Sequence, residues 1–355
     1  MAERVATSSS VIPRCNRNCR SRCRTRASTS SSFACMAKHV GRLSCAGQAR
    51  GMDNEWECVI VGGGAAGLSA ALVLGRARRR TVLIDAGGQS NRAAHGIGGL
   101  LGFDGVPPAD LYAEGRRELE RYPSVEVRDG EVAAGMVGDD GFTVDLADGT
   151  AERAGRLLLA TGMRYDYPDI PGLAPLWGRS VFHCPFCHGW EVRDQPLAVI
   201  AQGERAVHMA TLLRGWSDDV MLLTGGPAEL SDDDRARLDV AGIPVDERKV
   251  RELDSAAGEL RAVVFDDGAR LPRSALLVAA ELRQRSGLAA QLGVKLVATG
   301  PVSPEAVDVD PLYRTSVPGV FAAGDVCAQM PQIAAAVAAG SAAAVSVMAS
   351  ITEER

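Results

Sequence analysis

The sequence predicts an α/β protein of two Rossmann-like domains, each with a parallel sheet in a three-layer arrangement. The chain has 355 residues, of which 46% are hydrophobic, and this is enough for two hydrophobic cores. A short apolar run followed by a turn and a helical segment begins at Cys58, and the same pattern begins again at Leu197. Apolar runs of this kind are typical of strands that are buried on both faces of a parallel sheet.

The first 51 residues differ in composition from the rest of the chain. The net charge of the whole chain is −5, but residues 1–51 carry +9, so the remainder carries −14. This leader is rich in Ser and Arg and has no sustained apolar period, so we expect it to be disordered. The acidic remainder argues against nucleic acid as a partner.

Two interpretations of the leader stay open. Its composition, rich in Arg and Ser and poor in acids, is typical of an organelle transit peptide, and it lacks the apolar stretch of a secretory signal. We favour a start of translation at Met36 or Met52, because the recognisable fold begins only after Met52. We therefore expect a cytoplasmic protein, or an organellar one if the leader is a transit peptide. Five of the nine cysteines lie in the leader, and this distribution suits a reducing compartment.

A glycine-rich turn follows the first predicted strand, residues 58–61. Residues 62–67 read Gly-Gly-Gly-Ala-Ala-Gly, which is the pattern G-x-G-x-x-G. Gly62 permits the tight turn, Gly64 lets a pyrophosphate approach the backbone, and Gly67 lets helix and strand pack closely. The N-terminus of the following helix presents unpaired N–H groups to the phosphates.

The context of this turn strengthens the prediction of a dinucleotide site. A helix over 68–76 and a strand over 81–84 follow it, and the strand ends at Asp85. An acid at that position accepts hydrogen bonds from a ribose. The alternative is an incidental glycine-rich turn. The glycine-rich loop 87–108 is either part of the nucleotide site or a surface loop.

Short runs predict the elements that come next. They are a helix over 110–122 and strands over 125–127, 131–136, 142–146 and 157–162, the last ending in Ala160-Thr161-Gly162. Residues 147–150 form a hairpin turn. Three prolines between 168 and 175 mark a linker.

Residues 184–188, Cys-Pro-Phe-Cys-His, predict a redox-active dithiol. Two cysteines at this spacing can close a disulfide and lower each other's pKa, and the thiolate is the reactive form. His188 can take or give the proton that thiol–disulfide chemistry moves.

Three other interpretations of Cys184 and Cys187 remain. Cys-x-x-Cys-His is also the attachment signature of c-type haem, but that cofactor requires export. A zinc site usually needs a second ligand pair, and beyond Cys58 the only other cysteine is Cys327, so we expect no metal. The pair could also be two buried structural thiols.

The second nucleotide-type turn is damaged. After the strand at 197–200 it reads Ala201-Gln202-Gly203-Glu204-Arg205-Ala206, so the first glycine is lost. Glu204 adds negative charge beside the expected pyrophosphate, which Arg205 partly offsets. The next strand, 220–223, ends at Thr224-Gly225-Gly226, where a binder of the 2′-phosphate would place arginines. NADPH as a cofactor is therefore doubtful.

The last elements are a strand over 320–325 that ends in Gly324-Asp325 and a helix over 333–351. The helix is long and apolar enough for a membrane span. Because it consists mainly of Ala, Gly and Ser and follows the Gly-Asp turn, we expect instead a helix packed beneath a cofactor, and no membrane partner.

These motifs, Gly62–Gly67, Ala160–Gly162, Cys184–Cys187 and Gly324-Asp325, resemble in order and spacing those of the low-molecular-weight thioredoxin reductases, the class II pyridine nucleotide-disulfide oxidoreductases. The resemblance implies a discontinuous FAD-binding domain, residues 52–165 and 284–355. An NAD(P)-type domain that carries the dithiol, residues 166–283, is inserted into it. The FAD-binding residues that it implies are Gly62, Gly64, Ala65, Ala66, Gly67, Asp85, Ala160, Thr161, Gly162, Gly324, Asp325, Gln332 and Ile333.

The resemblance also implies roles for the cysteines. Cys187 lies against the flavin, and Cys184 exchanges with the substrate. His188 stands where that family usually has an acid, and Cys-x-x-Cys-His-Gly-x-Glu, ending at Glu191, resembles the branch of the gliotoxin and holomycin dithiol oxidases.

We therefore expect an FAD enzyme that oxidises dithiols to disulfides with oxygen as acceptor, using Cys184, Cys187 and His188. The alternatives are an NADPH-dependent thioredoxin reductase, and a flavin-binding redox sensor without turnover. The partner is a small dithiol or disulfide or a thioredoxin-like protein, and the family resemblance implies a homodimer.

Overall fold

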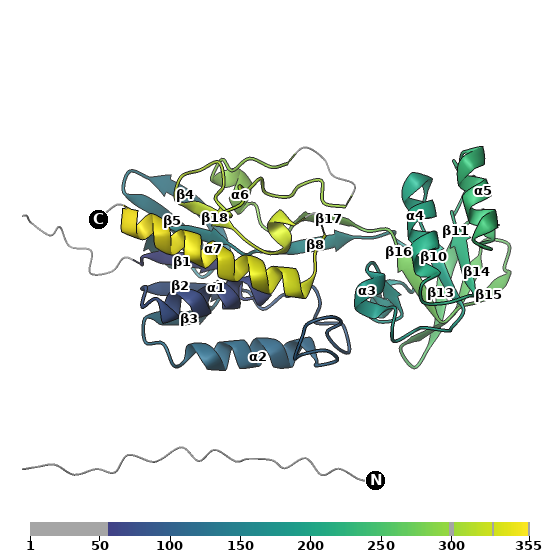
Figure 1. Ribbon diagram of the computed structural model, residues 1–355, viewed down its shortest axis with the longest axis horizontal. Coiled ribbons are helices and arrows are strands. Elements are labelled where there is room, and N and C mark those ends of the chain that lie inside the picture. Colours follow the sequence, from purple (N-terminus) through teal and green to yellow (C-terminus); the bar gives the residue numbers. More distant parts are fainter. Residues whose placement is uncertain (1–55, 298–301, 329, 354–355) are drawn as a thin grey trace, which may run out of the picture. The chain divides into compact units, whose positions relative to one another are not determined.

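The structure is a computed structural model that describes residues 56–297, 302–328 and 330–353. The leader, residues 1–51, and the two interpretations of it lie outside these residues. The prediction of an α/β protein with two Rossmann-like domains is confirmed by two five-stranded parallel sheets, each between two other layers (Figure 1).

The first sheet takes its strands from both ends of the chain. Its order is β18 (Val320–Ala322), β7 (Leu157–Leu159), β1 (Cys58–Val61), β2 (Thr81–Asp85) and β3 (Val125–Asp129), and all neighbours are parallel. The residues of the central strands β1, β2 and β7 are buried, because the sheet is covered on both faces.

Helices cover one face of this sheet and a second sheet covers the other. The helices are α1 (Ala65–Arg76), α2 (Pro108–Leu119) and α7 (Ile333–Glu353). The covering sheet is antiparallel and consists of β4 (Val132–Gly138), β5 (Gly141–Leu146) and β6 (Ala151–Ala154), with the short helix α6 (Leu288–Gln291) packed beside it. Alternate residues of β1 therefore enter two different cores, Ile60 on the helical side and Val59 on the other.

The second parallel sheet repeats this plan within a continuous stretch of chain. Its order is β12 (Val245–Asp246), β11 (Val220–Leu223), β10 (Leu197–Ile200), β16 (Ala275–Val278) and β9 (Val181–Phe182). Helices α4 (Gly203–Leu213) and α5 (Asp232–Val240) cover one face. The antiparallel strands β13 (Val250–Ala256), β14 (Glu259–Phe265) and β15 (Arg270–Pro272) cover the other.

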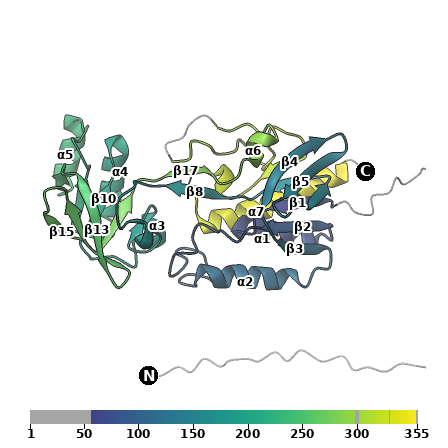
Figure 2. The ribbon, with the colours of Figure 1, turned by 180° about the vertical axis from the view of Figure 1, so that it is seen from behind.

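The chain passes between the two sheets twice, through strands that pair with each other. They are β8 (Met163–Asp166) and β17 (Glu281–Gln284), which are antiparallel, with Tyr165 opposite Leu282 (Figure 2). The predicted domain limits at 165/166 and 283/284 fall in these two strands and stay a prediction. Short helices η1 (Ala174–Leu176), α3 (Pro185–His188) and η2 (Asp325–Cys327) complete the described elements.

Helix α7 is the one described helix that is long and apolar enough to cross a membrane. It packs against α1 so closely that a Cβ on Gly340 would lie 2.0 Å from the carbonyl oxygen of Ala66. Seven of its residues are buried in this contact and against the sheet. The small side chains of α7 are thus explained by helix packing.

Candidate active site

A cavity of about 360 Å³ lies at the carboxyl ends of the first sheet's strands. All predicted cofactor-binding residues except Gly67 line it, and so do Cys187 and His188. Cys184 is not among the lining residues. Ligands of α/β proteins bind at this edge of a sheet, so the cavity is the candidate cofactor site.

The glycine turn between β1 and α1 has the geometry that a phosphate site needs. Gly62 has φ +110°, and a Cβ there would lie 2.2 Å from the carbonyl oxygen of Ala160. A Cβ on Gly67 would lie 1.8 Å from the carbonyl oxygen of Gly62, so Gly67 serves the packing of helix on strand and lies outside the cavity. Gly64 faces open space, since its nearest neighbour would be Gln89 at 3.9 Å.

The N-terminus of α1 is available for an anion. Gly64 is its N-cap residue, no side chain caps it, and its first turn contains no acid. The helix has 12 residues, and its free N–H groups favour a negatively charged group such as a pyrophosphate. The open side of Gly64 and this uncapped helix end fit the phosphates of FAD.

Asp85 is already engaged by groups around it. Its carboxylate accepts hydrogen bonds from the N–H groups of Gly63 (3.1 Å) and Gly87 (3.0 Å) and from Gln89, and it forms an ion pair with Arg116. Burial favours the neutral form, but the N–H groups and the Arg116 guanidinium together hold the pKa of Asp85 below its usual range. Its predicted contact with a ribose stays a prediction.

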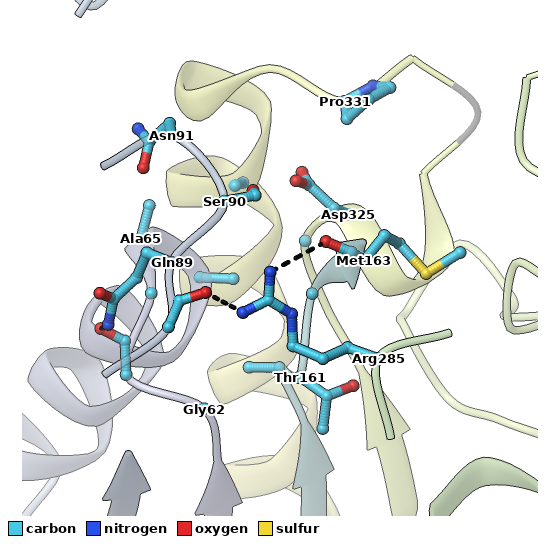
Figure 3. Close-up of a pocket in the computed structure, with 18 of the residues that line it drawn as sticks. Gly62, Ala65, Gln89, Ser90, Asn91, Thr161, Met163, Arg285, Asp325 and Pro331 are labelled. Carbon is cyan, nitrogen blue, oxygen red and sulfur yellow. Dashed lines mark hydrogen bonds between the residues drawn. The ribbon is translucent and has the colours of Figure 1, made fainter. Parts of the chain in front are cut away.

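Asp325 and Arg285 form the charged centre of the cavity. Burial raises the pKa of Asp325 to about 6, and the nearby Arg285 opposes this only in part. Figure 3 shows the Arg285 guanidinium reaching toward the loop that carries Gln89, with Asp325 above it. Arg285 donates to the carbonyl oxygens of Gly88 and Met163 and so ties this loop to the end of the first sheet.

The dithiol is positioned by a single helical turn, α3. Cys184 is its N-cap residue and is 8% exposed, whereas Cys187 lines the cavity. Both are free thiols in the structure. The hydrogen bond from Cys187, together with backbone N–H groups and against the effect of burial, lowers the pKa of Cys184. That same bond, and burial, raise the pKa of Cys187.

A glycine loop lies directly on Cys187. A Cβ on Gly98 would lie 2.6 Å from the carbonyl oxygen of Cys187 and 3.0 Å from its Cα. The absence of a side chain at Gly98 therefore allows the dithiol turn to approach the cavity. This assigns a role in the site to the loop 87–108, which the sequence left open.

His188 has one nitrogen engaged and one without a partner. Its Nε2 lies 3.1 Å from the carbonyl oxygen of Gly178, which makes it the donor. Its Nδ1 is buried and has no hydrogen-bond partner among the residues that the structure describes. Burial lowers the pKa of His188, so the neutral ring, with Nδ1 as an acceptor, is favoured.

The cavity residues that sequence reasoning did not name include Tyr165, His183 and Arg285. Tyr165 lies three residues after the Ala-Thr-Gly turn and His183 directly before Cys184, so their positions beside two motifs were a usable signal. Arg285 carries no comparable signal, because it follows β17, far from every motif in sequence.

Side chains at the second nucleotide-type turn bond to backbone carbonyl groups around it. Gln202 Nε2 donates to the carbonyl oxygen of Thr224 (2.9 Å), and the buried Thr224 hydroxyl donates to the carbonyl oxygen of Gly226 (2.6 Å). Arg205, which the sequence suggested as a phosphate partner, donates to the carbonyl oxygen of Ala280 (2.9 Å). The Glu204 side chain lies outside the described part of the chain.

Comparisons with known proteins show what this chain is similar to. The family model for pyridine nucleotide-disulphide oxidoreductases matches residues 56–340. Thioredoxin reductase tcpT of Claviceps purpurea is 33% identical over 298 residues, 81% of this chain and 92% of that protein.

Two solved structures are also similar. An oxidoreductase from Agrobacterium tumefaciens is 36% identical with a TM-score of 0.80, over 85% of this chain and all of that one. A protein named HlmI is 40% identical with a TM-score of 0.79, over 84% of this chain and 93% of that one.

The family, the cavity and the dithiol lead to the same enzyme class. The chain is a thioredoxin reductase-like, FAD-dependent thiol–disulfide oxidoreductase. Among the described residues there is no group of three or more His, Cys, Asp or Glu that could hold a metal. The resemblance drawn from four sequence motifs is therefore confirmed: this chain belongs to the pyridine nucleotide-disulphide oxidoreductase family.

Proposed function

We propose that the protein oxidises the two thiols of a small molecule to a disulfide at Cys184 and Cys187, with oxygen as the final electron acceptor. The observation that carries this direction is the second nucleotide-type turn. That turn lacks the first glycine, no arginine follows β11 at residues 224–226, and the Gln202 side chain donates to the carbonyl oxygen of Thr224 beside it. The dithiol, by contrast, borders the cofactor cavity through Cys187.

In this proposal FAD would be held by the glycine turn, the N-terminus of α1 and the first residues of α7, which all line the cavity. Gly64 and the uncapped helix end would bind the pyrophosphate, and Asp325 and Gln332 also line the cavity. FAD supplies, when bound, a two-electron acceptor for the dithiol that oxygen can reoxidise.

We place thiol exchange at Cys184 because Cys187 borders the cofactor cavity and Cys184 does not. One substrate thiolate attacks the Cys184 sulfur of the Cys184–Cys187 disulfide, forms a mixed disulfide and releases Cys187 as a thiolate. The second substrate thiolate then attacks the substrate sulfur, so that the product disulfide leaves and Cys184 departs as a thiolate. The substrate loses two electrons, and the dithiol gains them.

His188 is the proposed acid and base of these steps. Its neutral ring lies one residue after Cys187, and the unpartnered Nδ1 can accept a proton that a substrate thiol must lose. The bond from Nε2 to Gly178 fixes the tautomer in which Nδ1 is free to accept. The imidazole then returns the proton to a thiolate of the reduced dithiol.

One anaerobic titration tests the direction. The purified yellow protein is mixed first with NADPH, then with dithiothreitol, and finally with air, while the flavin absorbance is followed. We expect little bleaching by NADPH, full bleaching by dithiothreitol, and rapid recovery in air with one hydrogen peroxide per disulfide formed. Fast bleaching by NADPH, with slow recovery in air, would instead identify a reductase.

The cellular setting follows the same reasoning. We propose a homodimer in the cytoplasm, acting on a small dithiol or disulfide. The relative tcpT is named a thioredoxin reductase, which makes a thioredoxin-like protein the competing substrate. Steady-state rates with a reduced thioredoxin and with dithiothreitol, at equal thiol concentrations, separate the two substrate classes.

A further inference from the structure

Tyr165 is a further residue in the wall of the cofactor cavity. It belongs to β8, where it faces Leu282 of β17, and it lines the same cavity as Cys187, Asp325 and Arg285. Its ring lies 4.3 Å from the ring of His183, the residue that precedes Cys184. The ring position of Tyr165 is thus tied to the backbone that carries the dithiol.

The aromatic contacts around Tyr165 continue away from the cavity. Trp177 lies 5.9 Å from Tyr165 and from His183, and it stacks on Tyr167 at 4.3 Å. Tyr167 is therefore in the same group of rings, but it does not line the cavity. Two tyrosines that are two residues apart share one packing environment, and only Tyr165 reaches the site.

The hydroxyl of Tyr165 has no partner in the described part of the chain. The other tyrosine of the cavity, Tyr112, differs, because its hydroxyl donates to Asn91 Oδ1 at 2.6 Å. Tyr165 is half-buried, and its hydroxyl is accessible. A free donor in the wall of a cofactor cavity is available to a group that arises during the reaction or arrives with a ligand.

The charges around this hydroxyl keep it protonated. Burial first, and then the carboxylate of Asp325 and the two cysteines, raise the pKa of Tyr165 well above its usual range, while Arg285 opposes them. The protonated hydroxyl, which can donate a hydrogen bond, is therefore favoured. Cys187 lines the same cavity.

We propose that the Tyr165 hydroxyl donates a hydrogen bond to the Cys187 thiolate that thiol exchange at Cys184 releases, and that Tyr165 is thus a further catalytic residue. A donor to the charged form of a group favours that form, so this bond helps Cys187 to leave. The other groups that face Cys187 are Cys184, Asp325 and Glu191, with His188 next in the chain. Both carboxylates disfavour a thiolate, and Tyr165 offsets them. The inference rests on the proposed role of Cys187, but not on the direction of the reaction.

The test measures the acidity of Cys187 alone. In the holoenzyme with Cys184→Ser, a lone thiolate beside oxidised FAD gives a broad long-wavelength absorption band, and its amplitude is titrated against pH. Adding Tyr165→Phe should move the midpoint up by about one pH unit, a roughly tenfold loss of thiolate below it, since one hydrogen bond to a charged group is removed. Adding Tyr167→Phe, which removes a hydroxyl from the same ring cluster but not from the cavity, should leave the midpoint unchanged.

A second measurement does not need the flavin. The rate at which iodoacetamide alkylates Cys187 is followed by mass spectrometry as a function of pH, in flavin-stripped protein with the same three sets of substitutions. The same upward shift with Tyr165→Phe supports the proposal. An unchanged midpoint with Tyr165→Phe, or an equal shift with Tyr167→Phe, would overturn it. Absence of the absorption band in Cys184→Ser itself would count against the role of Cys187, and the alkylation midpoints would still decide the role of Tyr165.

Discussion

Cys184 and Cys187 are three residues apart, yet the structure gives them different surroundings. Cys187 borders the cofactor cavity, and Cys184 caps α3 outside its lining. We therefore expect the long-wavelength band of a thiolate beside FAD in Cys184→Ser and not in Cys187→Ser, measured in the visible spectrum at pH 8. Both variants should lose turnover, because each lacks one half of the disulfide. A band in Cys187→Ser alone would reverse the two assignments.

His188 should matter for rate more than for binding. Replacing it by Ala removes the acceptor Nδ1, so we expect turnover to fall by roughly 10²–10⁴-fold, with the thiolate band of Cys184→Ser retained. Burial lowers the pKa of His188, so its ring stays neutral, and able to act as a base, at a lower pH than the ring of an exposed histidine. The turnover rate of the wild type should therefore begin to fall only at that lower pH. His208→Ala, at an exposed position of α4, is the control. Turnover of His188→Ala within a few-fold of wild type would mean that this ring only packs.

Asp325 should make the stability of the flavin-stripped protein depend on pH. Its pKa is about 6 in the fold against 3.8 for an ordinary aspartate, so the folded state binds a proton that the unfolded chain has lost between these values. Stability therefore falls as pH rises through this window, and the whole loss is present above pH 6. The asparagine in Asp325→Asn cannot ionise, so the variant escapes this loss. The difference in free energy of unfolding between Asp325→Asn and wild type, measured in urea, should therefore shift in favour of the variant by up to about 3 kcal/mol from pH 3.5 to pH 7.5.

An equal difference between Asp325→Asn and wild type at both pH values would show that the carboxyl titrates normally. In the holoenzyme, by contrast, Asp325→Asn should be worse than wild type, because it removes a carboxyl group that lines the proposed cofactor site. Flavin retention on gel filtration is the measurement for that second effect.

At the scale of elements, helix α7 is apolar on two faces, and only one of them is covered by the rest of the described chain. One face packs on α1 and the sheet, while Ala335, Ala338, Ala342 and Val345 are exposed on the other. The helix carries no charged residue before Glu353. A wholly apolar exposed face of this length is what a second copy of the chain would cover in the proposed homodimer.

Val345→Glu should therefore weaken the proposed dimer. Val345 is 60% exposed, and a carboxylate there would be buried without a partner in an interface formed by α7. Light scattering after gel filtration should show a shift from dimer to monomer at micromolar concentration. Val240→Glu, on the 92% exposed end of α5, places the same charge elsewhere and should leave the mass unchanged. A wild type that is monomeric, or a Val345→Glu dimer, would place the interface on another surface.

At the scale of the whole molecule, two repeats of one architecture are joined by the β8–β17 pair. This pair is held by side chains at its ends, since Glu305 accepts from Arg283 (3.0 Å) and from the backbone N–H of Gln284 (2.8 Å). The site uses both repeats, because the first supplies the cavity and the second supplies Cys187 and His188.

The leader lies outside both repeats. A chain that begins at Met52 should keep its flavin and full activity, because residues 1–51 lack an apolar pattern that could form a core. Flavin content and steady-state oxidation of dithiothreitol, compared with the full chain, are the measurements. Loss of flavin or of solubility on this truncation would assign a structural role to the leader.

Local sequence patterns predicted the buried strands and the glycine turn closely. The predicted strands 58–61, 197–200 and 220–223 have these same limits in the structure, because a strand buried on both faces must be apolar throughout. Helix α1 begins at Ala65, not at Leu68, since Ala65 to Gly67 of the phosphate turn already form its first turn. The sequence did not predict β6, β8, β9 and β12 to β17. Several of these strands are partly exposed and mix charged with apolar residues, whereas β9 and β16 are wholly buried but were missed all the same.

The sequence by itself determined the family, the cofactor and the dithiol, because each depends on residues that are adjacent in the chain and dictate a local backbone shape. Only the tertiary structure decided which carbonyl groups the side chains at the second turn bind, and that Tyr165 and Arg285 line the cavity. Arg285 lies 197 residues from Gly88, whose carbonyl it binds. Contacts of that separation arise from the packing of whole layers, and no local pattern of residue types specifies them.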